Sequence, residues 1–190
     1  MEFDLSIFIL ATTFYLIGSL PFALIVHKLL STSDPRESGS NNPGATNMFR
    51  ISGPLAGSLT FLGDFLKGFI PIFFLVDHGD LSMYVMSFFL LVGHMFSIFN
   101  AFRGGKGVAT SFGFLVAIDI KVGLVLLLIW ALVFVVKKIS GLAAVISFLS
   151  LPAVIHFIIS DNLIFYLSII HSLIILINHK SNIKGILQRQ

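Results

Sequence analysis

Long apolar stretches fill most of this 190-residue sequence. They are 5–26, 55–76, 81–100, 122–136, 141–159 and 163–178, with a shorter one at 108–118. A helix needs about 20 mostly apolar residues to cross the hydrocarbon core of a membrane. Because 56% of the residues are apolar and only 11% are charged, with a mean hydropathy of +1.00, a disordered chain and a water-soluble fold are both excluded. We expect an all-α integral membrane protein with a single domain, residues 1–190.

The segment 108–136 allows two interpretations. It is either one long span that carries Asp119 and Lys121, or two helices joined by a turn at these residues. In the second interpretation the helix 108–118 is only about 17 Å long, which is well short of a hydrocarbon core of about 30 Å.

The distribution of basic residues favours the second interpretation. Seven spans with the N-terminus outside place ten of the twelve basic residues on the inner side. These are Lys28, Arg36, Arg50, Arg103, Lys106, Lys137, Lys138, Lys180, Lys184 and Arg189. Six spans divide the same ten residues equally between the two sides, which gives no orientation. We therefore predict seven transmembrane helices, a short fourth helix, the N-terminus outside and the C-terminus in the cytoplasm.

The N-terminus resembles a signal peptide only in its apolar run. Glu2 and Asp4 stand where a signal peptide would carry basic residues, and no small-residue cleavage site follows. We expect the first span to be retained.

The first polar segment on the inner side runs from residue 34 to residue 50. Small residues, Asn and Gly over 38–47 leave backbone N–H groups accessible and permit positive φ angles, which is typical of an anion-binding loop. Arg50 could bind a phosphate through two hydrogen bonds. The alternative is an ordinary polar turn between two spans.

The second polar segment, 103–111, opens the short helix. Gly104, Gly105 and Gly107 would let a ligand approach the backbone at a helix N-terminus, and Lys106 adds a positive charge. The segment is not a Walker A loop, because Gly107 follows Lys106 where Ser or Thr is required. The alternative is a basic inner loop that obeys the positive-inside rule.

The third polar segment, 179–182, follows the last span. His179 could bind a phosphate or transfer a proton near neutral pH. A basic tail at the membrane surface explains this segment equally well.

Two charged residues lie inside the second span. Asp64 and Lys67 are three residues apart, so they share one helix face and can pair, either as a structural ion pair or in support of a site. The histidines outside the third segment show no ligand spacing, so we expect no metal and no cofactor. No nucleotide fingerprint is present, and we expect no nucleic-acid partner.

Taken together, the three segments predict a site for one or two phosphorylated substrates, beside helices that could hold a lipid chain. A transporter or channel for phosphorylated metabolites is the main alternative, although the outer halves of the spans are apolar. His156 and Asp161 match the H-x-x-x-x-D spacing of acyl-CoA-dependent acyltransferases, but they lie at the outer end of the sixth span and we interpret the match as chance.

Several motifs in chain order resemble those of one known family. They are 39–50 (Gly-Ser-Asn-Asn-Pro-Gly-Ala-Thr-Asn-x-x-Arg), Gly93-His94 with 104–109 (Gly-Gly-Lys-Gly-Val-Ala), and His179-x-x-Asn182-Ile183. Together with Gly18-Ser19-x-Pro21 and Asp64-x-x-Lys67-Gly68, they resemble PlsY, the bacterial acyl-phosphate:glycerol-3-phosphate acyltransferase.

The resemblance implies a seven-helix inner-membrane enzyme with its active site on the cytoplasmic face. It would transfer a fatty acyl group from acyl phosphate to the sn-1 hydroxyl of glycerol 3-phosphate, giving lysophosphatidic acid and phosphate, the first acylation step of phospholipid biosynthesis. The implied partners are these substrates, membrane lipid and the enzyme that produces acyl phosphate.

The resemblance also implies roles for individual residues. Catalytic roles would fall to Arg50, Lys106 and His179. Substrate would be bound by Ser40, Asn42, Gly44, Ala45, Thr46, Asn47, Gly104, Gly105, Gly107 and Asn182, with Asp64 and Lys67 in support. The sequence departs from the family pattern at Asn41, Ser97, Gly141, Ala144 and Gly185, and near the C-terminus.

Overall fold

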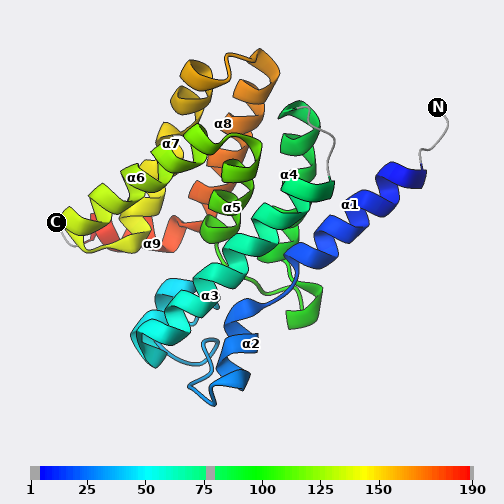
Figure 1. Ribbon diagram of the computed structural model, residues 1–190. Helices are drawn as coiled ribbons and strands as arrows, with labels where there is room; N and C mark the ends of the chain where they lie inside the picture. The colour runs from blue at the N-terminus through cyan, green and yellow to red at the C-terminus, as the bar shows by residue number, and fades with distance from the viewer. Residues whose placement is uncertain (1–4, 76–79, 189–190) are drawn as a thin grey trace.

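The computed structural model describes residues 5–75 and 80–188, and the regular elements in these ranges are all helical (Figure 1). The elements are α1 (Leu5–Gly18), α2 (Phe22–Leu29), α3 (Ala45–Leu75), α4 (Asp80–Met95), the 3₁₀ turn η1 (Ile98–Asn100), α5 (Val108–Ile118), α6 (Ile120–Lys137), α7 (Ser140–Ile158), α8 (Asn162–Asn178) and α9 (Lys180–Leu187). The all-α prediction is confirmed. Glu2, Asp4 and Arg189 lie outside the described residues.

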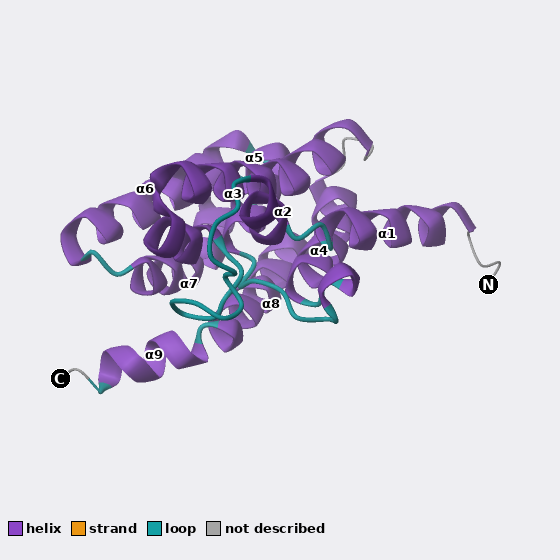
Figure 2. Cartoon of the chain, turned by 90° about the horizontal axis from the view of Figure 1, so that it is seen from below, coloured by secondary structure: helices purple, strands orange, loops and turns teal. Residues whose placement is uncertain are grey.

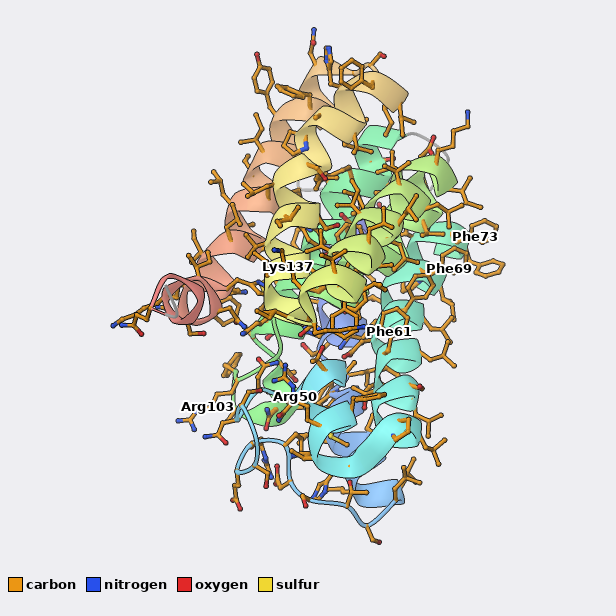
Figure 3. The ribbon with its side chains drawn as sticks, turned by 90° about the vertical axis from the view of Figure 1, so that its left-hand side faces the viewer. Arg50, Phe61, Phe69, Phe73, Arg103 and Lys137 are labelled. Carbon is orange, nitrogen blue, oxygen red and sulfur yellow. The ribbon has the colours of Figure 1, made fainter. Side chains whose placement is uncertain are left out.

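The helices share one buried apolar core and leave large apolar side chains on the outside. Phe14, Leu90 and Phe148, from α1, α4 and α7, are fully buried within the same cluster. On the outer surface of α3, Phe61 and Phe73 are 37% and 45% exposed, and Figure 3 shows them on the same side as Phe69. An outer surface of this kind is stable against lipid and costly in water, as expected of an integral membrane protein.

Only some of the helices are long enough to cross a membrane. The described residues contain four helical segments with the required length and apolarity: Ala45–Phe74, Ser82–Asn100, Ile120–Lys137 and Ser140–Ile158. The bent pair α1 and α2 would make a fifth, whereas α5 and α8 are shorter apolar helices. The seven-span count and the orientation therefore remain predictions.

The candidate span 5–26 is not one continuous helix, because the chain bends by 42° between α1 and α2, which together are apolar and long enough for one broken span. Pro21 has no N–H to continue the helix. The break in the helix leaves backbone groups inside the protein without a hydrogen bond within the helix. One of them is the carbonyl oxygen of Leu20, which accepts a hydrogen bond from Lys67 Nζ of α3 at 2.7 Å. The apolar run hid this break because its residues stay apolar on both sides of the bend.

The segment 108–136 is two helices, as the second interpretation predicted. Helix α5 ends at Ile118, and Asp119 caps the N-terminus of α6 by accepting hydrogen bonds from the N–H groups of Lys121 (2.7 Å) and Val122 (3.1 Å). A Cβ added at Gly123 would lie 2.7 Å from the Cα of Val116. These residues would be about 10 Å apart along one helix, so the chain reverses here.

Two helical segments were not predicted. Helix α3 begins at Ala45, ten residues before the expected start at 55, and breaks at Gly53, whose φ of 86° and ψ of 179° are not helical. The short first part folds back on the second, since Gly57 packs against the backbone of Phe49. Helix α9 follows α8 directly. Both unpredicted segments carry candidate site residues.

Candidate active site

The three polar segments meet at one end of the helix bundle. Figure 2 looks onto the molecule from below and shows the loops gathered beside α9. Arg36 in the first segment donates from Nη1 to Asn100 Oδ1 at 3.3 Å, immediately before the second segment. Lys106 in the second segment donates to Asn182 Oδ1 in the third. The structure thus brings together residues that are far apart in the sequence.

The loop of the first segment is held by Asn47, whose side chain is buried. Its Oδ1 accepts from the backbone N–H of Ser40 at 2.9 Å. Its Nδ2 donates to the carbonyl oxygens of Pro35 and Ser38 at 3.1 and 3.0 Å. Asn41 has a φ of 55°, so it adopts the left-handed conformation that the family's usual glycine would allow. The Asn47 side chain therefore shapes the loop.

The first segment ends in a helix N-terminus. Gly44 precedes α3, and its carbonyl oxygen accepts the hydrogen bonds of Asn47 N (3.0 Å) and Met48 N (3.1 Å). The N–H groups of Ala45 and Thr46, the first two residues of α3, have no partner within the helix and lie at the positive end of its dipole. Arg50 follows one turn later with an exposed side chain. This arrangement suits an anion.

The second segment is packed against His94 so closely that only glycine fits. Gly105 N donates to the carbonyl oxygen of His94 at 3.2 Å. A Cβ on Gly104 would overlap that carbonyl oxygen, and one on Gly105 would overlap the imidazole. Gly107 has a φ of 86° and forms the N-cap of α5. The glycines therefore place Lys106 at the start of a second helix in the same region.

The third segment lies where α8 gives way to α9. His179 Nδ1 donates to the carbonyl oxygen of Ile175 at 2.8 Å, which leaves Nε2 of the neutral ring as a possible acceptor. Asn182 lies in α9 beside Gly141 at the start of α7, and a Cβ at Gly141 would overlap the Asn182 amide. The departure from the family pattern at Gly141 thus leaves room for Asn182.

The site is positively charged and partly buried. Burial lowers the pKa of Lys106, and the nearby charge of Arg50 lowers it further. Burial is also the main cause that lowers the pKa of His179, so its ring is neutral at pH 7. Among the described residues no carboxylate forms an ion pair with Arg50 or Lys106. The two cations are therefore available to an anionic ligand.

A second arginine of the loop is already paired. Arg36 Nη2 lies 2.6 Å from Asp34 Oδ2, and hydrogen bonding by Arg36 lowers the pKa of Asp34 to about 2. Figure 3 shows Arg50 and Arg103 in the lower part of the molecule. Arg36 is thus paired with a carboxylate, whereas Arg50 forms no ion pair among the described residues.

The predicted pairing of Asp64 and Lys67 is confirmed. Lys67 Nζ lies 2.7 Å from Asp64 Oδ1, and both side chains are buried. Asp64 Oδ1 also lies 3.6 Å from Nδ1 of His94, which in turn is 3.0 Å from Thr110 Oγ1. The pair therefore contacts His94, which packs against the glycine loop, and its support of a site remains a prediction.

The sequence analysis missed several residues of this region. A small polar cavity behind the glycine loop is lined by Asp64, Lys67, His94, Asn100 and Arg103, among others. Asn100 also donates to the carbonyl oxygen of Arg103. Of these, Asp64 and Lys67 stood out as charges inside a span, Arg103 lay in the second polar segment, and His94 belongs to the Gly93-His94 motif, whereas Asn100 carried no signal.

His156 and Asp161 do not approach the site. Asp161 caps α8 by accepting from the N–H of Ile164 at 2.8 Å, and the His156 ring packs against Phe165. Residue 156 is fifteen residues from Gly141 along α7, which is roughly 22 Å. The structure agrees with the interpretation of this match as chance.

Comparisons with known proteins show similarity to glycerol-3-phosphate acyltransferases over nearly the whole chain. A family model described as glycerol-3-phosphate acyltransferase matches residues 8–189. The glycerol-3-phosphate acyltransferase of Ruthia magnifica is 40% identical over 190 residues, covering 98% of this chain and 96% of the relative. That of Nitrosomonas eutropha is 36% identical over 185 residues, covering 94% and 92%.

Two solved structures are similar in fold. The crystal structure of PlsY (YgiH), an integral membrane glycerol 3-phosphate acyltransferase, in its glycerol 3-phosphate form has a TM-score of 0.89 at 33% identity, covering 96% of this chain and 92% of that chain. Its lysophosphatidic acid form has a TM-score of 0.86 at 32% identity, with the same coverage.

The apolar helical fold and these similarities define an integral membrane acyltransferase and do not favour a transporter. The chain belongs to the glycerol-3-phosphate acyltransferase family of the PlsY type, whose reaction is part of phospholipid biosynthesis.

Proposed function

We propose that this protein transfers a fatty acyl group from acyl phosphate to the sn-1 hydroxyl of glycerol 3-phosphate, releasing lysophosphatidic acid and inorganic phosphate. The convergence of Arg50, Lys106, His179 and Asn182 from three separate segments supports this most strongly, because it concentrates anion-binding groups at one end of an apolar bundle. The proposed location is the cytoplasmic face of a bacterial inner membrane, in one domain with seven spans and the N-terminus outside.

The proposed substrates carry two phosphate groups, and the site offers two helix N-termini. The start of α3, with the backbone of Gly44, Ala45 and Thr46 and the side chains of Ser40 and Asn42, suits the head group of the acyl phosphate. The start of α5, with Gly104, Gly105 and Gly107, lies beside Lys106. Arg50, Lys106, His179 and Asn182 would then hold the phosphates and the glycerol. Asn47, Asp64 and Lys67 would support these groups from behind.

The proposed reaction needs no nucleophile from the protein. The glycerol hydroxyl oxygen attacks the acyl carbon, and the bond from that carbon to the phosphate oxygen breaks, so the phosphate leaves with the bonding electrons. The hydroxyl proton passes to a phosphate oxygen of a substrate. Arg50 and Lys106 stabilise the negative charge that develops on the leaving group, and the helix termini fix the relative orientation of the two substrates.

An assay of the acyl donor tests this proposal. Purified protein in lipid receives glycerol 3-phosphate with either palmitoyl phosphate or palmitoyl-CoA, and both lysophosphatidic acid and phosphate are measured. We expect turnover with palmitoyl phosphate alone, with the two products formed in equal amounts. Turnover with palmitoyl-CoA alone would contradict the proposal that acyl phosphate is the donor. It would instead support a role for His156 and Asp161, which match the acyl-CoA-dependent spacing.

The proposed donor also implies a partner. Acyl phosphates are reactive anhydrides, so the enzyme that produces the donor would act close to this one. Co-purification of that enzyme from membranes tests the association separately from the reaction.

A further inference from the structure

Helices α8 and α9 border an open, shallow apolar groove of about 500 Å³ on the outside of the molecule. Leu176 and Ile177 come from the last turn of α8, and Ile183 comes from α9. The groove is separate from the polar cavity behind the glycine loop, with which it shares no residue. Ile177 is 64% exposed here, so the groove offers an apolar surface that the protein itself does not cover.

Two lysines border the same groove. Lys180 and Lys184 are four residues apart on α9, so they lie on one helix face, and both are exposed. Like charges at this spacing repel each other, and an anion bound between them relieves the repulsion. The apolar floor and the two lysines together match a molecule with an acyl chain and a negatively charged head group.

The surroundings do not neutralise these charges. Between residues 137 and 188 the only acidic residue is Asp161, which caps α8 at the end opposite to α9. Lys137 and Lys138 lie at the turn between α6 and α7. That turn lies close to α9, since Gly141 contacts Asn182, and Figure 3 shows Lys137 on this side of the molecule. Within residues 137–188, therefore, no carboxylate lies at this end of α7, α8 and α9.

We propose that the groove between α8 and α9 is a binding site for an anionic diacyl phospholipid of the surrounding membrane. The head-group phosphate lies between Lys180 and Lys184, and an acyl chain lies along Leu176, Ile177 and Ile183. The bound lipid is distinct from the substrates, because the lysines and the groove face away from Asn182 and Lys106.

The site has a consequence for the reaction, and this consequence rests on the proposed function. Helix α9 carries Lys180 and Lys184 towards the groove and Asn182 towards Lys106. A lipid that holds α9 in place also holds Asn182 in place. An enzyme that produces a phospholipid precursor would in this way respond to the anionic lipid content of its own membrane.

Direct measurement of lipid binding tests the proposal without any turnover. The full-length protein in a mild detergent is titrated with phosphatidylglycerol or phosphatidylcholine, and the bound lipid is counted by native mass spectrometry. We expect phosphatidylglycerol to bind about 30-fold more tightly, given two lysines at the membrane surface. The variant Lys180→Gln/Lys184→Gln should lose this preference.

A matched control removes two charges elsewhere. Lys28→Gln/Lys121→Gln changes exposed lysines of α2 and α6 and should keep the preference. Equal binding of the two lipids, or an equal loss in both double variants, would overturn the proposal. So would displacement of phosphatidylglycerol by glycerol 3-phosphate, which would place the lipid in the active site. If the double variant of α9 does not fold, Lys184→Gln alone should show about a fivefold loss.

Discussion

Lys106 Nζ donates a hydrogen bond to the side-chain oxygen of Asn182, which lies 76 residues further along the chain. The contact joins the glycine loop before α5 to the first turn of α9. His179, which precedes α9, is close enough to Lys106 for the lysine charge to lower its pKa in addition to the effect of burial. Residues from the second and third polar segments therefore form one electrostatic unit.

Removal of either cation of the site should abolish turnover without unfolding the protein. We expect Lys106→Ala and Arg50→Ala each to lower kcat/KM at least about 100-fold, the usual cost of losing a group that stabilises developing charge. Thermal unfolding should remain close to that of the wild type, because neither side chain forms an ion pair among the described residues. Lys28→Ala, at an exposed lysine of α2, is the control. Near-normal rates in both site variants would contradict the assignment of Arg50 and Lys106 to the active site.

A negative charge at position 182 should weaken the binding of glycerol 3-phosphate more than removal of the Asn182 amide does. Asn182→Asp places a carboxylate beside Lys106. This carboxylate would form an ion pair with the lysine and would repel a substrate phosphate. We expect the KM for glycerol 3-phosphate to rise further in Asn182→Asp than in Asn182→Ala. An Asp variant that equals the Ala variant in KM would show that Asn182 does not face the substrate.

The lowered pKa of Lys106 predicts how the activity depends on pH. Lys106 is charged below its pKa and loses its charge as the pH rises through that value. Because burial and Arg50 lower the pKa, kcat/KM should fall on the alkaline side at a lower pH than an ordinary lysine would give. In Lys106→Arg the residual activity should not fall in this range, since arginine does not deprotonate. The pH profiles of the two proteins check this, and an unchanged alkaline fall in the arginine variant would exclude Lys106 as its cause.

The buried ion pair of Asp64 and Lys67 should affect stability because each charge compensates the other. Asp64→Asn leaves Lys67 buried and unpaired, and we expect it to lower the free energy of unfolding by about 3–5 kcal/mol. Replacement of both residues in Asp64→Leu/Lys67→Leu should cost less than the single change, even though the hydrogen bond to Leu20 is lost. Unfolding in mixed micelles with increasing denaturing detergent measures both. A double variant less stable than Asp64→Asn would contradict this explanation.

The glycine loop should tolerate no side chain at Gly104. A Cβ there would overlap the carbonyl oxygen of His94, so Gly104→Ala should displace the loop and Lys106 with it. We expect loss of turnover with the helix content preserved. Gly185→Ala is a matched control, because nothing lies within 4 Å of its added Cβ. Helix propensity favours alanine there, so this variant should be active and at least as stable as the wild type.

Much of the fold could be predicted because every membrane-spanning helix needs about 20 mostly apolar residues. The expected helix over 108–118 has the observed bounds, and the ends of α7 and α8 differ from the expected ones by one residue or less. The bend after Gly18 was missed because polarity does not change there. Its local cause is Pro21, and tertiary contacts stabilise it, since Gly18 packs against the backbone of Leu90 and Lys67 satisfies the freed carbonyl group of Leu20.

The site was predictable only where a residue is unusual for its surroundings. Arg50, Lys106 and His179 stood out as polar residues beside apolar spans, and the structure brings their segments together. Asn100 did not stand out, because its role is to connect Arg36 to the backbone of Arg103 across the fold. Helix α9 escaped prediction because it has only eight residues, although Ile183, Ile186 and Leu187 recur at helical spacing.

A crystal structure of this protein with bound glycerol 3-phosphate tests the proposed site most directly. We expect the phosphate of the substrate within hydrogen-bond distance of Lys106 Nζ, a glycerol hydroxyl within hydrogen-bond distance of His179 Nε2, and Asn182 and Arg50 around the same ligand. Helix α9 should stay in place, since Asn182 already contacts Lys106 without the ligand. A phosphate bound instead in the groove between α8 and α9, with no contact to Lys106 or His179, would contradict the assignment of the active site.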